Sequence, residues 1–200
     1  MTDHYFTAAP ASATELRPIR VTLAGHAHTL TTAGGVFSPD RLDKGTAILL
    51  EEVPAPPSTG SLLDLGCGWG PVALTMALLS PDADVYAVDV NARALDLVRH
   101  NAATVGASRV IACAPDDVPA DVRFATIWSN PPIRVGKAVL HDLLHTWLPR
   151  LEATGTAYLV VQKNLGADSL QRWISTELRM PCERHATSGG FRVLAVRHGH

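Results

Sequence analysis

The chain has 200 residues, of which 46% are hydrophobic and 18% are charged. This length supplies one complete hydrophobic core but not two comfortable domains, and the composition excludes a disordered chain. The formal net charge of −2 excludes a protein that wraps nucleic acid through overall positive charge. A local basic face is still compatible with it, because binding depends on local potential.

The cysteines and the apolar segments exclude several further classes. Cys67, Cys113 and Cys182 are widely spaced and form no CxxC pair, and the histidines are scattered. This pattern indicates reduced thiols rather than a disulfide scaffold or a zinc site. Residues 1–20 lack the apolar segment of a signal peptide, and no apolar run reaches the ~20 residues that cross a membrane. We therefore expect a cytoplasmic protein with no metal and no membrane partner.

The first 57 residues predict an arm, a hairpin and a helix. Residues 1–18 are polar and irregular. Two short alternating runs at 19–23 and 28–32 predict a β-hairpin. Residues 42–53 predict a helix, which ends at the prolines that follow. We expect residues 1–57 to pack on the core formed by residues 58–200, so that the chain is one structural domain overall.

From residue 61 onward, strands and helices alternate. Strands are predicted over 61–65, 85–90, 109–113, 124–128 and 156–162, and helices over 71–79, 91–103, 135–148 and 169–177. The chain ends in a predicted antiparallel hairpin, 183–186 and 191–196, joined through Ser188-Gly189-Gly190. This pattern predicts an α/β fold. We expect a Rossmann-like, doubly wound, mostly parallel seven-stranded sheet with the hairpin at one edge.

A glycine-rich loop, Asp64-Leu65-Gly66-Cys67-Gly68-Trp69-Gly70, connects a strand to a helix. Glycines permit a tight turn and close approach of a ligand, and the helix N-terminus favours an anionic group. Pro71 breaks the dinucleotide fingerprint GxGxxG, and no P-loop is present. Asp89, at the end of the next strand, can accept hydrogen bonds from ribose hydroxyls. Together these features predict S-adenosylmethionine (SAM) as cofactor; the alternative is a structural turn with a surface aspartate.

A second motif, Ser129-Asn130-Pro131-Pro132-Ile133, follows the fourth strand, whose carboxyl end faces the ligand crevice. The Asn130 side-chain oxygen and the Pro131 carbonyl are two acceptors that can hold both N–H bonds of an –NH2 group. The two prolines stiffen the loop. Holding both hydrogens directs the nitrogen lone pair at a methyl donor, so catalysis can rest on alignment. The alternative is a rigid turn, which Asn-Pro commonly forms.

These motifs resemble the class I SAM-dependent methyltransferases, and more narrowly the small-domain branch that includes bacterial 16S ribosomal RNA guanine-N2 methyltransferases. The resemblance covers nearly the whole chain. Besides the two motifs above, it is carried by His4-Tyr5-Phe6, Gly35-Val36-Phe37-Ser38, Leu42-Asp43-Lys44-Gly45-Thr46, Val88-Asp89, Ile133-Arg134-Val135-Gly136-Lys137, Val161-Gln162-Lys163, Leu165-Gly166-Ala167 and Gly189-Gly190-Phe191-Arg192-Val193-Leu194.

The resemblance implies a role for individual residues. Asn130, Pro131 and Pro132 would be catalytic and hold the target nitrogen. Asp117 would contact the adenine amine, and Phe37 and Thr46 would close the pocket from the N-terminal segment. The implied cofactor-binding residues are Thr46, Asp64, Gly66, Cys67, Gly68, Asp89, Val90, Asp117 and Asn130. The implied substrate-binding residues are Phe37, Ile133, Arg134, Lys137, Lys163 and Phe191.

The resemblance implies that the acceptor is N2 of guanine in ribosomal RNA or the small ribosomal subunit. A protein glutamine side chain, N6 of adenine and a non-catalytic SAM-binding module are the alternatives. Many amine methyltransferases carry an aromatic residue where this chain has Ile133, so base stacking is expected from Phe37 or Phe191. The motifs also contain five basic residues that predict either a phosphate-binding rim or ordinary surface charge, namely Lys44, Arg134, Lys137, Lys163 and Arg192.

Overall fold

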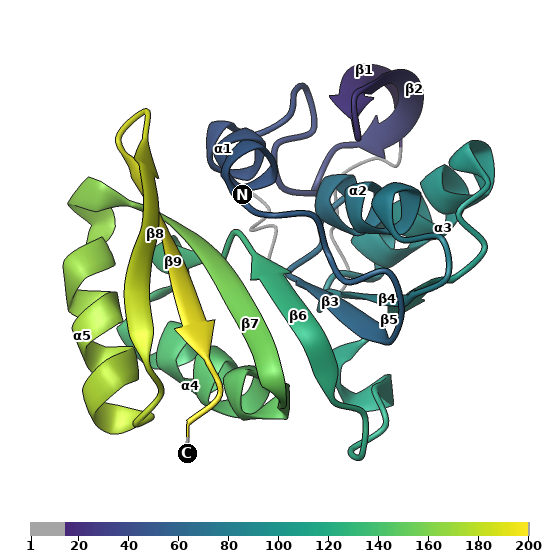
Figure 1. The fold of residues 1–200 in the computed structure, drawn as a ribbon. Helices are drawn as coiled ribbons and strands as arrows, with labels where there is room; N and C mark the ends of the chain where they lie inside the picture. The colour runs from purple at the N-terminus through teal and green to yellow at the C-terminus, as the bar shows by residue number, and fades with distance from the viewer. Residues whose placement is uncertain (1–14, 200) are drawn as a thin grey trace.

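The computed structural model describes residues 15–199, and its strands and helices follow the predicted alternation (Figure 1). The His4-Tyr5-Phe6 motif and most of the predicted arm lie outside the described residues. The main elements are β1 (Leu16–Leu23), β2 (His26–Ala33), α1 (Lys44–Glu52), β3 (Ser61–Leu65), α2 (Pro71–Leu79), β4 (Asp84–Val88), α3 (Ala92–Val105), β5 (Val110–Cys113), β6 (Phe124–Ser129), α4 (Lys137–Trp147), β7 (Leu151–Gln162), α5 (Ala167–Glu177), β8 (Cys182–Ser188) and β9 (Phe191–Arg197). Short 3-10 turns connect several of them.

The central sheet has seven strands in the order β5-β4-β3-β6-β7-β9-β8. The first five strands of this order are parallel, and β9 runs antiparallel to both β7 and β8. The predicted mostly parallel sheet with a terminal hairpin is therefore confirmed. The chain moves outward from β3 to β5 and then returns to place β6 on the other side of β3. A ligand crevice is expected outside the carboxyl ends of β3 and β6, because the strand order reverses there.

Helices cover both faces of this sheet. Successive side chains of a strand point to opposite faces, so Leu62 and Leu63 enter different cores. Leu62 belongs to the core that α1, α2 and α3 cover, whereas Leu63 packs in the core that Leu144 of α4 and Ile174 of α5 complete. This arrangement leaves the carboxyl ends of the parallel strands open between the loops that lead into the helices.

The N-terminal hairpin is longer than the sequence indicates, since β1 and β2 have eight residues each. Ala24 and Gly25 form its two-residue turn with φ of 49° and 81°, as a type I′ turn requires. Asn101 of α3 fastens the hairpin to the core. Its side chain accepts a hydrogen bond from the Thr31 N–H (2.8 Å) and donates to the carbonyls of Thr31 (2.9 Å) and Trp69 (3.0 Å). One buried amide therefore links the hairpin to the glycine-rich loop.

Strand β7 begins at Leu151, five residues before the predicted start, and its pairing with β6 is irregular between Phe124 and Thr126. Gly155 lies at this irregularity. A Cβ built there would lie 2.9 Å from the Phe124 carbonyl oxygen and 3.1 Å from that of Ala125. Only glycine lets the two backbones approach this closely. No helix among the described residues combines the length and the apolar character needed to span a bilayer.

We expect Gly155→Ala to lower the free energy of unfolding by about 1–3 kcal/mol, because backbone atoms must shift to accept the added carbon. Urea denaturation monitored by circular dichroism measures this change. The matched control is Thr154→Ala at the exposed neighbouring position, where a change within about 0.5 kcal/mol is expected. Equal free energies of unfolding for the two variants would contradict the close approach at Gly155.

Candidate active site

A cavity of about 330 Å³ lies at the carboxyl ends of β3, β4, β6 and β7, beside the first residue of β9. The cavity therefore lies in the crevice that the strand order predicts. The lining residues are Phe37, Asp43, Gly66, Gly68, Asp89, Asn91, Ala94, Asn130, Pro131, Pro132, Ile133, Arg134, Val160, Gln162, Leu165 and Phe191. Ten of the residues that the sequence assigned to a site are therefore together in one cavity.

The glycine-rich loop forms one wall and is held by backbone hydrogen bonds to the end of β4. The N–H groups of Gly66 and Cys67 both donate to the Val88 carbonyl, at 2.8 and 3.0 Å. Gly66 and Gly68 have φ of +80° and +54°, a region that favours glycine. A Cβ built on Gly66 meets no atom within 4 Å. The loop backbone therefore faces the cavity directly, without a side chain in between.

Asp89 is the carboxylate beside this loop. Its Oδ2 accepts a hydrogen bond from the Gly68 N–H (2.9 Å), and its Oδ1 accepts one from the Asn91 N–H (2.9 Å). Burial raises the pKa of Asp89, and these backbone donors act in the opposite direction. Each carboxylate oxygen has a further lone pair, so both can still accept from the hydroxyl groups of a ligand.

Asp64 lies behind the loop rather than in the cavity wall. It is fully buried, its Oδ2 accepts from the Ala73 N–H (2.9 Å), and burial raises its pKa from 3.8 to about 8. Cys67 is also buried, and the pKa of its thiol lies well above 9.0 for the same reason. Neither side chain contacts the cavity, and the Cys67 thiol is not an activated nucleophile.

The shifted pKa of Asp64 predicts a pH dependence of stability. The native protein retains a proton that the unfolded chain releases above pH 3.8, so this group's stabilising contribution is complete below that pH and is lost as pH rises toward about 8. Relative to Asp64→Asn, whose amide oxygen can still accept from Ala73, the wild-type protein should lose roughly 1 kcal/mol per pH unit between pH 5 and 8. Urea denaturation of both ligand-free proteins at several pH values measures this difference. Parallel pH profiles would contradict it.

Besides Thr46, Asp64 and Cys67, four more of the residues assigned by resemblance lie outside the cavity wall. Val90 is 42% exposed, and Asp117 lies on an exposed 3-10 turn after β5. Lys137 begins α4 and Lys163 follows β7, both with exposed side chains. Their roles in binding stay predictions.

The Asn-Pro-Pro loop forms the wall opposite the glycines. The Asn130 Nδ2 donates to Oδ2 of Asp43 (2.9 Å) and to Oγ1 of Thr46 (3.0 Å). Both amide hydrogens are thus engaged, and Oδ1 is the atom left to accept from a ligand. Pro132 has φ −76° and ψ 72°, and the Ile133 N–H donates to the Pro131 carbonyl at 2.8 Å. This inverse γ-turn leaves one lone pair on that carbonyl.

Phe37 and Phe191, the two aromatic residues from which base stacking is expected, both line the cavity. Thr46 is buried behind the wall and contacts Asn130. Arg192 does not belong to the predicted basic rim. It is only 7% exposed, and its Nη1 is ion-paired with Oδ1 of Asp168. The side chain points to the α5 face because it alternates with Phe191 along β9.

Sequence reasoning missed six lining residues, namely Asp43, Asn91, Ala94, Val160, Gln162 and Leu165. Asn91 begins the predicted helix 91–103, and in the structure its side chain caps α3 by accepting from the Arg93 and Ala94 N–H groups at 3.0 and 3.4 Å. Asp43 is likewise an N-cap residue, at the start of α1. Its contact with the Asn-Pro-Pro loop cannot be predicted from the neighbouring sequence. Gln162 is the last residue of β7 and Leu165 ends the 3-10 turn that follows it, and the end of a parallel strand does indicate the crevice.

The acceptors of the cavity and the open backbone of the glycine-rich loop suit SAM. Asp89 offers acceptors for ribose hydroxyls, and the exposed backbone of the glycine-rich loop lies at the N-terminal end of α2, which favours a carboxylate. When bound, SAM supplies an activated methyl group on its sulfonium. The Asn130 Oδ1 and the Pro131 carbonyl are acceptors on the far wall.

Comparisons with known proteins agree with this chemistry. The model of the family "methyltransferase small domain" matches residues 27–195. "Uncharacterized protein YbxB" of Bacillus subtilis is 34% identical over 172 residues, which cover 84% of this chain and 86% of that protein. "Ribosomal RNA small subunit methyltransferase C" of Pseudomonas syringae pv. tomato is 38% identical over 185 residues, which cover 90% of this chain but only 54% of the relative. The chain thus spans about half the length of that relative.

Among solved structures, the "T. Thermophilus 16S rRNA N2 G1207 methyltransferase (RsmC) in complex with AdoMet and Guanosine" shares the fold with a TM-score of 0.77. The sequence identity is 22%, and the match covers 94% of this chain and 52% of that one. The fold likeness and the cavity agree with the family model, which extends over most of the chain. The chain therefore belongs to the methyltransferase small domain family and is a SAM-dependent methyltransferase.

Proposed function

We propose that this chain transfers the methyl group of SAM to an exocyclic amine of ribosomal RNA, namely N2 of guanine. The observation that carries the proposal is the orientation of Asn130, whose two amide hydrogens are bound to Asp43 and Thr46. Its Oδ1 is therefore left to accept from the target amine. Asp89 and the backbone of Gly66 and Gly68 would hold the cofactor on the opposite wall.

The proposed role of the wall residues is alignment. The Asn130 Oδ1 and the Pro131 carbonyl would accept the two N–H bonds of the amine, which orients the nitrogen lone pair toward the cofactor side of the cavity. Phe37 and Phe191 would contact the faces of the base. Holding a nucleophile in a reactive geometry accounts for much of the acceleration in such reactions, so no ionisable base at the nitrogen is required.

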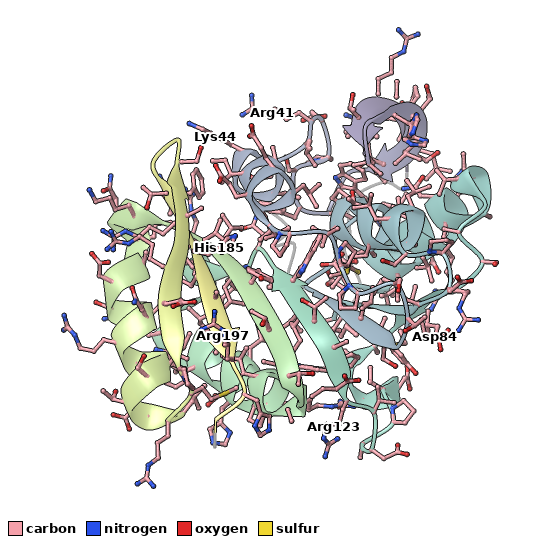
Figure 2. The ribbon with its side chains drawn as sticks, viewed as in Figure 1. Arg41, Lys44, Asp84, Arg123, His185 and Arg197 are labelled. Carbon is pink, nitrogen blue, oxygen red and sulfur yellow. The ribbon has the colours of Figure 1, made fainter. Side chains whose placement is uncertain are left out.

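Basic side chains near the cavity support RNA as the acceptor. Arg41 and Lys44 lie beside the start of α1, at the opposite end of the molecule from Arg123, which precedes β6 (Figure 2). Arg134 lines the cavity, and Lys137 and Lys163 begin the segments beside it. Among residues 15–199, no ion pair involves Arg41, Lys44, Arg134, Lys137 or Lys163. Basic side chains that lie beside a cavity and form no ion pair are suited to phosphate contacts.

Protein glutamine and N6 of adenine are the alternative acceptors, because an Asn-Pro-Pro wall accommodates any planar –NH2 group. The names of the Pseudomonas and T. thermophilus relatives favour ribosomal RNA, and the latter favours guanine N2. The free basic side chains favour RNA over a protein substrate.

The acceptor is identified by incubating the protein with labelled SAM and either small-subunit rRNA, small ribosomal subunits or total protein. The expected product is N2-methylguanosine, detected by mass spectrometry of the digested RNA. N6-methyladenosine or methylglutamine as the labelled product would replace the proposed acceptor. If the protein binds SAM but labels neither RNA nor protein, the proposed function is wrong.

Lys137→Ala combined with Lys163→Ala is expected to weaken RNA binding and its salt dependence. Each phosphate contact on a single strand contributes about 0.7 to the slope of log K against log salt, so the double variant should reduce the slope by roughly 1.4. Filter binding over a range of salt concentrations measures it. The matched control is Arg172→Ala on the exposed face of α5. An equal change in both proteins would contradict a phosphate-binding mouth.

A further inference from the structure

We infer that Asp43, together with Thr46, is a positioning residue that fixes the orientation of the Asn130 carboxamide. This inference rests on the proposed role of Asn130 in methyl transfer. Asp43 is also the N-cap of α1, and a capping role would explain two of its contacts, those to the N–H groups of Gly45 (2.7 Å) and Thr46 (3.2 Å). The third contact, from the Asn130 Nδ2 (2.9 Å), crosses 87 residues of sequence and has no capping function.

The hydrogen-bond inventory permits one orientation of the Asn130 amide. A carboxylate only accepts hydrogen bonds, so the atom of Asn130 that faces Asp43 must be the nitrogen. The second hydrogen of that nitrogen is taken by the Thr46 hydroxyl (3.0 Å). Rotating the amide by 180° would place its oxygen against the Asp43 carboxylate, which cannot donate, and Oδ2 of Asp43 would lose its hydrogen bond from Asn130. The carboxylate therefore directs Oδ1 toward the target amine.

The Asp43 carboxylate is itself held in place by the first turn of α1. The backbone N–H groups of Gly45 and Thr46 fix its Oδ2, and the positive end of the helix dipole favours its charge. Gly45 lets the first turn of α1 lie close to Phe191 and Asn130. A Cβ built there would lie 3.1 Å from Cε1 of Phe191 and 3.3 Å from Nδ2 of Asn130. The start of α1 thus packs against both walls of the substrate side of the cavity.

This packing couples two distant motifs. Without the contact between Asp43 and Asn130, the Leu42–Thr46 segment would only begin a helix, and the Asn-Pro-Pro loop would only form a turn. Joined through one carboxylate oxygen, they act as a unit: the helix N-terminus fixes Asp43, Asp43 and Thr46 fix the Asn130 nitrogen, and the Asn130 oxygen is presented to the amine.

The test separates the capping role of Asp43 from its positioning role. Asp43→Ser retains an N-cap residue but its shorter side chain does not reach Asn130. We expect it to lower kcat for methyl transfer roughly 10- to 100-fold, while the KM for SAM changes less than about threefold. Asp43→Asn keeps the length and is expected to lose less activity than Asp43→Ser. The matched control, Asp40→Ser, alters an exposed acid three residues away and should leave kcat unchanged.

The Thr46 side of the contact offers a second matched pair. Thr46→Val removes the hydroxyl acceptor at constant shape, and Thr46→Ser retains it. We expect Thr46→Ser to lose less activity than Thr46→Val, because only the serine can still accept from Asn130. An equal loss in the two variants would indicate that packing, rather than the hydrogen bond, is the role of Thr46.

A readout independent of activity is the side-chain amide of Asn130 in ¹H–¹⁵N spectra, assigned by its disappearance in Asn130→Ala. In the Asp43→Ser protein these amide protons should shift and exchange faster with water, because one acceptor is lost. In the Asn130→Ala background, Asp43→Ser should reduce the residual transfer less than about twofold, since its effect passes through Asn130.

The outcomes distinguish this inference from the proposed function. Full activity of Asp43→Ser beside an inactive Asn130→Ala, an unchanged Asn130 amide resonance, or a further large loss in the double variant would each overturn the positioning role while leaving the proposed function intact. Full activity of Asn130→Ala would instead overturn the role of Asn130 in the proposed function.

Discussion

Replacing Asn130 by alanine is expected to lower kcat by at least about 10²-fold while SAM still binds with nearly unchanged affinity. The variant removes Oδ1 of Asn130, the side-chain acceptor that we propose holds the target amine. The Pro131 carbonyl remains, but one of its lone pairs is engaged by Ile133. A single remaining acceptor no longer holds both hydrogens of the amine. Single-turnover transfer from labelled SAM, with SAM affinity measured by calorimetry, separates the two effects.

The control for this prediction is Asn164→Ala, which removes an exposed amide on the 3-10 turn after β7. It should retain wild-type kcat. A similar loss of transfer in both variants would indicate that any change near the cavity mouth disturbs the reaction. A loss of SAM affinity in Asn130→Ala equal to its loss of kcat would show that Asn130 acts mainly in cofactor binding.

Replacing Asp89 by alanine is expected to weaken SAM binding by roughly 10²-fold. A charge-assisted hydrogen bond contributes about 1.5–3 kcal/mol, and the proposed pair to the ribose hydroxyls would be lost together. The substitution also frees the N–H groups of Gly68 and Asn91, which the carboxylate holds. Some loss of stability will therefore accompany it, and calorimetry is best performed well below the melting temperature of the variant.

Two further variants serve as controls for the SAM affinity of Asp89→Ala. Asp89→Asn retains an acceptor for one backbone donor but loses the charge, so its SAM affinity should lie between those of the wild type and Asp89→Ala. Asp82→Ala changes an exposed acid on the loop between α2 and β4 and should bind SAM like the wild type. If Asp89→Ala binds SAM normally at a temperature where it is folded, the cofactor does not use this carboxylate.

The part of the site that could be predicted from the sequence is the part whose chemistry is local. The glycine-rich loop is a single strand–turn–helix unit, and its positive φ angles, its backbone donors and the following helix N-terminus all derive from seven consecutive residues. Asp89 and Asn130 could be placed because each directly follows a parallel strand, and the carboxyl ends of parallel strands meet at one edge of the sheet.

Arg192 shows where this reasoning fails. Its neighbourhood, beside Gly189 and Gly190 and next to the cavity-lining Phe191, suggests a position at the rim. Which face of the sheet a strand residue occupies depends on the register of the strand, and a shift of one residue exchanges the faces. The register of β9 against β7 directs Phe191 to the cavity and Arg192 toward α5 and Asp168.

The sequence by itself determined the fold class and the cofactor and predicted ten of the residues that line the cavity, because periodicity, turn residues and strand ends are encoded within short segments. Only the tertiary structure decided what those residues contact. Asp43 is the N-cap of α1, and only the packing of α1 beside β7 and β9 brings its carboxylate within 2.9 Å of Asn130. Such contacts depend on the packing of elements that are far apart in the chain, so no local sequence pattern predicts them.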